Sequence, residues 1–165
     1  MIDYSLIFND IESTLIRVGA KNLPADQNRI ELNKYRHLEG KTFTDSEYYR
    51  KLVCIVFYSG FRAATVTAKC DVIRKHFPDD KTVATYGDDE IRKILDDPEM
   101  IRNRRKIKAC VKNARAVREI VSKHGSFQRF VDSFAPTESF ENLMLLKEDL
   151  EYRFEDLVGL QHITC

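Results

Sequence analysis

A chain of 165 residues with 43% hydrophobic residues, 32% charged residues and a formal net charge of +1 suits one domain built around a single core. This composition excludes an intrinsically disordered chain, and the lack of an apolar run of about 18 residues excludes a helical membrane span. There is no secretory signal pattern at the N-terminus and no C-x-x-C pair among the four cysteines. We therefore expect a cytoplasmic protein with reduced thiols.

Apolar residues recur at helical spacing along nearly the whole chain, which predicts an all-α fold. Capping and helix-breaking residues bound the expected helices, which cover residues 7–18, 44–58, 63–77, 88–95, 98–124, 126–134 and 139–156. Thr44 is expected to cap the central helix, Pro98 to begin the long helix and Gly125 to end it. Ser126 should begin the next helix with a Ser-x-x-Gln capping box. The expected core anchors of the last helix are Leu143, Leu146, Leu150 and Phe154.

The charge of the chain is sorted rather than mixed. Residues 101–118 hold eight Lys and Arg and no acid, so the rest of a chain of net charge +1 carries −7. Such a block can be a solvated helix face, which is the common case, or half of a binding site for a polyanion. The block lacks the acids at i,i+4 that a purely structural helix would use for support, and this favours the binding site.

The last nine residues, LVGLQHITC (157–165), are similar to the hairpin of a helix-hairpin-helix element. Leu157, Gly159, Leu160, Thr164 and Cys165 match the pattern of that hairpin, and Gln161 stands where the second glycine is usual. Such tight turns bring backbone N–H groups against DNA phosphates without reading the base sequence. The chain stops inside the second helix of this element, which predicts a continuation beyond Cys165.

Several blocks in order resemble the DNA-3-methyladenine glycosylase I family: FTDSEYYRKLVCIVFYSGF, TVTAK, IRKHF, EIRKILDDPEMIRNRRKIKACVKNARA and GSFQRFVDSF. The resemblance covers residues 44–165 and marks the chain as a divergent member. It implies a single multi-helix domain, 1–165, of the helix-hairpin-helix DNA glycosylase type, with the hairpin beginning at 157–165. It also implies base excision repair: an alkylated purine, chiefly 3-methyladenine, is flipped out and its N-glycosidic bond is hydrolysed.

The resemblance also implies where the site residues lie. The candidates for the base pocket or for a wedge side chain that fills the gap left by the flipped base are Tyr35, His37, Phe57, Tyr58, Gly60 and Phe61. Phe61 is the preferred wedge, with a core phenylalanine as the alternative. The candidates for DNA binding are Arg62, Arg102, Arg104, Lys106, Lys108, Lys112, Arg115, Val158, Gly159, Leu160, Gln161 and Thr164. Within the basic block, Arg102 and Asn113 are expected to hold helix ends.

The sequence departs from the family pattern at the pocket and at the metal site. Ile55 or Val56 stands where the family has its pocket carboxylate and Ala63 where it has a pocket tryptophan, so the catalytic residue is unknown and an acid beyond residue 165 is one possibility. The resemblance implies zinc ligands in an N-terminal Cys-Gly-Trp and in a late His and Cys, as in the bacterial family, but this chain has no tryptophan and no cysteine before Cys54. Only His162 and Cys165, a lone H-x-x-C, stand near its end. We expect no metal and no cofactor.

Two other classes of function stay open. A non-catalytic helix-hairpin-helix DNA-binding module would bind kinked or abasic duplex without cleaving a glycosidic bond. A helical protein-interaction domain would use its sorted charge to bind an acidic protein. For the glycosylase interpretation, the expected partner is double-stranded DNA with an alkylated base, no membrane is involved, and the protein is expected to be a monomer.

Overall fold

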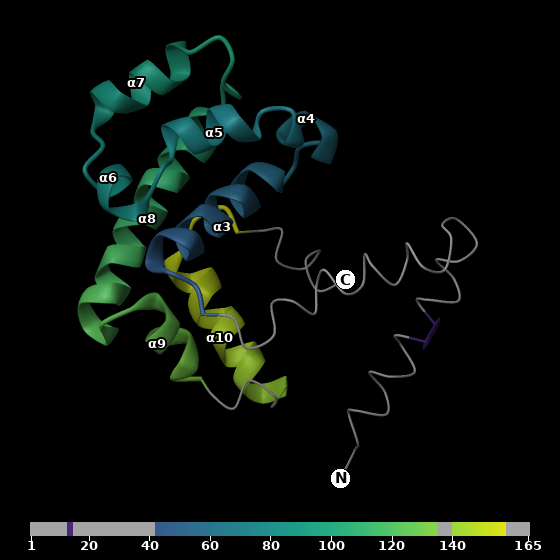
Figure 1. Cartoon of the computed structure of the whole chain (residues 1–165), viewed down its shortest axis with the longest axis vertical. Helices are drawn as coiled ribbons and strands as arrows, with labels where there is room; N and C mark the ends of the chain where they lie inside the picture. The colour runs from purple at the N-terminus through teal and green to yellow at the C-terminus, as the bar shows by residue number, and fades with distance from the viewer. Residues whose placement is uncertain (1–12, 15–41, 135–139, 158–165) are drawn as a thin grey trace. The chain divides into compact units, whose positions relative to one another are not determined.

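The computed structural model describes residues 13–14, 42–134 and 140–157. The chain divides into two compact units, Met1–Thr42 and Phe43–Cys165, and nearly all described residues belong to the second. Its helices are α3 (Asp45–Tyr58), α4 (Ala63–Thr67), α5 (Cys70–His76), α6 (Asp80–Ala84), α7 (Asp88–Asp96), α8 (Arg104–His124), α9 (Phe127–Asp132) and α10 (Phe140–Arg153) (Figure 1). No strand occurs among the described residues, and the predicted all-α class is confirmed. None of the described helices is both long and apolar enough to cross a membrane.

The central helix begins where the sequence predicted. Glu47 N donates to Thr44 Oγ1 (3.3 Å) and Thr44 N donates to Glu47 Oε2 (2.8 Å), which is a complete capping box. Tyr49, Leu52, Val53, Val56 and Phe57 of α3 are buried, at the spacing of one helical face. The predicted helix over residues 7–18 lies outside the described residues, apart from two helical residues at 13–14.

The single helix expected over residues 63–77 is wrong. The chain forms α4 and α5 instead, because Lys69 leaves the helical region, with φ −110° and ψ 3°. The apolar spacing itself was informative, since Val66 and Ile73 are both buried. The helix α6 was not predicted, although Asp79 caps it by accepting a hydrogen bond from Thr82 N (2.8 Å).

The long helix α8 begins six residues later than Pro98, where the sequence placed its start. Residues 97–100 form a turn closed by Met100 N donating to Asp97 O (3.2 Å). Asn103 then caps α8, because its Oδ1 accepts a hydrogen bond from Lys106 N (3.2 Å). The predicted end is confirmed, with Gly125 in the left-handed conformation at φ 84°.

Two details of the C-terminal helices correct the sequence prediction. Ser126 caps α9 by accepting from Arg129 N (3.1 Å), but no Ser-x-x-Gln box forms because the third residue after Ser126 is Arg129. In α10, Leu146 is buried as expected, whereas Leu143 is 45% exposed. Of the predicted core anchors, only those from Leu146 onward pack against the core.

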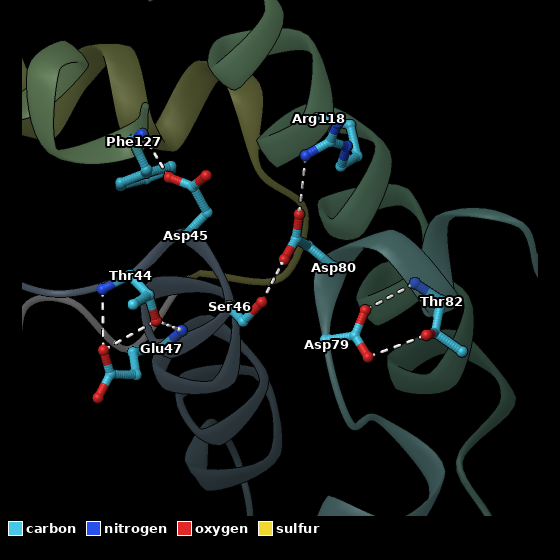
Figure 2. A network of polar contacts seen from close by, with 9 residues as sticks. All are labelled: Thr44, Asp45, Ser46, Glu47, Asp79, Asp80, Thr82, Arg118 and Phe127. Atoms are coloured by element: carbon cyan, nitrogen blue, oxygen red, sulfur yellow. Dashed lines mark hydrogen bonds and ion pairs between the residues drawn. The ribbon is translucent and has the colours of Figure 1, made fainter. Parts of the chain in front are cut away.

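The N-termini of three helices are tied together around α8, which packs against α3, α6, α7 and α9 (Figures 1 and 2). Asp45 Oδ1 at the start of α3 accepts a hydrogen bond from Phe127 N at the start of α9 (2.8 Å). Ser46 Oγ donates to Asp80 Oδ1 (2.8 Å), and Arg118 Nη1 lies 3.4 Å from Asp80 Oδ2. The Asp80 side chain is fully buried, so this network fixes α6 between α3 and α8.

Acid should destabilise the fold through its capping carboxylates. Hydrogen bonds from the backbone and side chain of Thr82 hold the pKa of Asp79 below its usual value, and the hydrogen bond with His76 lowers the pKa of Asp97. A lowered folded-state pKa stabilises the protein above the unfolded value of about 3.9, and this stabilisation is lost as the pH falls through the folded value.

We therefore expect the melting temperature to fall below about pH 4. Asp79→Asn keeps a capping oxygen but cannot be protonated, so melting curves of this variant should fall less steeply with acid. Superimposable pH profiles of the variant and the parent would contradict the assignment.

Candidate functional site

A tight turn of residues 59–61, called the wedge turn after the role predicted for Phe61, joins the end of α3 to α4. Gly60 has a φ of 76°, which side-chain-bearing residues rarely adopt, and a Cβ at this position would meet nothing within 4 Å. Phe61 is partly buried and packs against the core. Tyr58 Oη lies 2.9 Å from Thr67 Oγ1 and so links the last turn of α3 to α4. The backbone of the turn is therefore braced, while Phe61 keeps part of its surface exposed.

A buried cation lies beside this turn. Lys106 is only 2% exposed, and its Nζ donates to the carbonyl of Val56 (2.6 Å) and to Asp156 Oδ2 (3.1 Å). The same Nζ is 5.7 Å from the centroid of the Phe61 ring. Arg105 Nη2 lies 3.1 Å from the other oxygen, Asp156 Oδ1. One lysine thus contacts the end of α3, the wedge turn and the segment that follows α10.

Residues 154–157, the entry segment, lead into the predicted hairpin and are fixed to α8. The Asn113 side chain makes two hydrogen bonds with the backbone of Glu155: its Oδ1 accepts from N (2.8 Å) and its Nδ2 donates to O (3.0 Å). Lys112 forms an ion pair with the Glu155 carboxylate. Phe154 and Leu157 are buried on either side. Asn113 therefore holds the chain just past the end of α10, in line with the helix-end role expected for it.

The structure sorts the predicted DNA-binding cations into two groups. Lys106 and Lys112 have acidic partners, and Arg115 donates to the carbonyls of Ala84 (3.1 Å) and Tyr86 (2.7 Å). Of the predicted DNA-binding cations, the exposed ones that have no hydrogen-bond or ion-pair partner within the described part of the chain are Arg62, Arg102, Arg104 and Lys108. Arg104 and Lys108 are four residues apart on α8 and share one face.

The candidates for the base pocket are only partly described. Phe57 is fully buried and its ring lies 5.9 Å from that of Phe77, which places it in the core, whereas Tyr58 is 38% exposed. The pocket candidates Tyr35 and His37 lie outside the described residues. So do five of the DNA-binding candidates: Val158, Gly159, Leu160, Gln161 and Thr164. A cavity of about 30 Å³ between α3 and α5, lined in part by Cys54 and Cys70, has room for about one water. It is too small for a base.

The C-terminal half of α3 carries no acid, because the acids of this helix, Asp45 and Glu47, lie in its first turn. Val56 is fully buried and Ile55 packs partly buried against the core. Asp156 does reach this end of α3 through Lys106, and its φ of 61° lies in the left-handed region, which aspartate tolerates better than most residues. Sequence reasoning missed Asp156; its one signal was its place directly before the hairpin motif.

The described residues give no support to a thiol or metal site. Burial raises the pKa of the Cys110 thiol far above its usual value and also raises the pKa of Cys54, and a protonated thiol is a poor ligand and nucleophile. No group of three or more His, Cys, Asp or Glu that could hold a metal ion occurs among the residues the structure describes. His162 and Cys165 lie outside those residues.

Comparison with known proteins finds a matching family model and similar solved structures. The family model described as methyladenine glycosylase matches residues 32–155. A 3-methyladenine DNA glycosylase I from Staphylococcus aureus has 23% identity over 72% of this chain and 72% of that chain, with a TM-score of 0.57. Another 3-methyladenine DNA glycosylase I has 26% identity over 72% of this chain and 75% of that chain, with a TM-score of 0.56. A variant of such an enzyme in complex with 3-methyladenine has 23% identity, covers 72% and 73%, and has a TM-score of 0.57.

Proposed function

Because the chain belongs to the methyladenine glycosylase family, we propose that it is a DNA repair glycosylase that removes alkylated purines, chiefly 3-methyladenine, from duplex DNA. The observation that carries this proposal is the junction along the N-terminal half of α8. There the basic block most typical of the family contacts the end of α3 and the Phe61 ring of the wedge turn through Lys106, and it holds the entry segment through Asn113. The turn proposed to enter the duplex and the segment that leads into the predicted hairpin are then held by the same helix.

The proposed DNA contacts are the exposed cations near this junction. Arg104 and Lys108 would bind phosphates from one face of α8, and Arg62, at the N-cap of α4, would bind them beside the wedge turn. Lys106 is left out of the proposed contacts because it is buried and already paired. The hairpin at 157–165 would add backbone N–H contacts. Such an interface binds duplex DNA largely independently of base sequence.

The proposed reaction does not need an acid to protonate the base before it leaves. A methyl group on N3 gives adenine a positive charge, so the base can leave C1′ of the deoxyribose without first accepting a proton. Water then supplies a hydroxyl group to C1′ and releases one proton, and an abasic site remains. The protein has to extrude the nucleotide, which costs a few kcal/mol and less for a damaged base. Phe61 is the proposed wedge that would fill the resulting gap.

One observation favours a second candidate function. The apolar residues Ile55 and Val56 occupy the end of α3 where the family pattern led us to expect a carboxylate. A non-catalytic module with the same fold would bind abasic or kinked duplex and release no base. Measuring the release of free base from methylated duplex DNA separates the two candidates, whereas binding alone does not.

Removing two exposed cations of α8 should weaken the binding of every duplex. For Arg104→Gln combined with Lys108→Gln we expect the slope of log K against log salt to become shallower by about 2, because each lost phosphate contact changes it by about 0.9. The matched control is Lys81→Gln with Lys93→Gln, which removes the same charge from exposed positions on α6 and α7. Fluorescence anisotropy at several salt concentrations measures both. Equal slopes for the two double variants would show that Arg104 and Lys108 of α8 do not contact the DNA.

A further inference from the structure

We propose that Lys106 is a positioning residue that holds the wedge turn and the entry segment in one fixed arrangement. This inference rests on the proposed function, because the turn and the hairpin are the elements that would contact DNA. It goes beyond that function in assigning a role to a cation that cannot itself reach a phosphate. Three observations carry it: a helix end without a basic residue of its own, a buried ion pair and a left-handed backbone residue.

The end of α3 lacks its own positive charge. The last four carbonyl groups of a helix have no donor within the helix, and the partial negative charge there favours a cation. No basic residue lies in the last turn of α3. Lys106 supplies the donor from α8, with 2.6 Å between its Nζ and the carbonyl of Val56. The carbonyl it binds lies three residues before Ser59, where the wedge turn begins.

The counter-charge for Lys106 comes from the entry segment. A buried ammonium group is unfavourable without a partner, and Asp156 Oδ2 lies 3.1 Å from Nζ. Asp156 holds this position with its backbone at φ 61°, which few residues other than glycine, asparagine and aspartate tolerate. Displacing the entry segment would separate the pair and leave both charges buried, and displacing the end of α3 would take the Val56 carbonyl away from Nζ. Both elements are therefore positioned against the same ammonium group.

A comparison of Lys106→Met with a substitution of the neighbouring Arg105 tests this role. We expect the single-turnover rate of base release to fall about 100-fold, the effect of a small misplacement of groups that must align with the substrate. Binding of undamaged duplex should change by less than about twofold, because the side chain makes no phosphate contact. Arg105→Gln removes the same charge from a residue that contacts the same carboxylate. Because the Arg105 side chain is 76% exposed, this variant should keep its rate of base release within about twofold of the parent.

A double variant separates positioning from simple charge neutralisation. Lys106→Met combined with Asp156→Asn removes both buried charges, and asparagine also tolerates the left-handed backbone. We expect this double variant to regain most of the melting temperature that Lys106→Met loses, while its rate of base release stays low, because the carbonyl of Val56 still has no donor. Recovery of both stability and rate would overturn the proposal. If Lys106→Met alone does not fold, the double variant still gives this result.

A readout that needs no catalysis keeps the two proposals apart. The chain has no tryptophan, so Phe61→Trp places a single emitter on the wedge turn. In this background, adding Lys106→Met should change the emission and anisotropy of Trp in the free protein, and adding Arg105→Gln should not. If the parent chain releases no base, the proposed function fails, and the emission still decides the role of Lys106. Identical emission in the two variants would overturn the positioning role.

Discussion

Arg118→Met is expected to lower the free energy of unfolding by about 3 kcal/mol. The carboxylate of Asp80 is fully buried, and Ser46 and Arg118 are its hydrogen-bond partners in the network of Figure 2. Removing Arg118 leaves a buried negative charge with one hydroxyl group to stabilise it. The lower end of the usual range applies, because Arg118 is 40% exposed and its Nη1 lies 3.4 Å from the carboxylate.

The opposite substitution should cost less. Asp80→Asn keeps an acceptor for Ser46 and removes the charge that needs a partner, while Arg118 can turn its guanidinium group toward water. We expect a loss of about 1 kcal/mol for this variant. Urea unfolding of both variants measures the difference. A larger loss for Asp80→Asn than for Arg118→Met would contradict this account, because it would mean that the buried carboxylate does not depend on Arg118 for its stabilisation.

Asn113→Ala is expected to cost about 2 kcal/mol and to lower base release as well. It removes both hydrogen bonds from the side chain to the backbone of Glu155, and so frees the entry segment from α8. Lys112→Ala is the matched control, since it removes an exposed ion pair to the same residue and should cost less than about 1 kcal/mol.

Unfolding measurements and base release on the same two preparations test this prediction. A small effect of Asn113→Ala on stability together with normal base release would mean that the entry segment is held in place by Phe154 and Leu157 alone.

Local signals in the sequence were enough for much of the fold. Thr44 and Gly125 bound their helices as predicted, because capping depends on a few neighbouring residues. The start of α8 was misplaced because Asp97-Pro98 is a good helix start in isolation, whereas Asn103 is the residue that caps the helix. The break between α4 and α5 at Lys69 has no comparable signal in the sequence.

The candidate site was harder to predict, because counting charges does not distinguish paired cations from free ones. Lys106 lies four, seven and eleven residues before Cys110, Asn113 and Val117, all buried in α8, so helical spacing could have placed it on the inner face. Asp156 could not have been found in this way. Its contact with Lys106 joins residues fifty positions apart and depends on how the chain past α10 returns to α8.

The most direct test of the proposed function is the release of free 3-methyladenine from methylated duplex DNA, with the protein in excess and the products separated by chromatography. We expect release well above the spontaneous rate, with one abasic site formed for each base released and with a rate that falls as salt weakens binding. Salt-dependent binding of the same duplex with release no faster than in the absence of protein would contradict the enzymatic function and leave a DNA-binding module of the glycosylase fold.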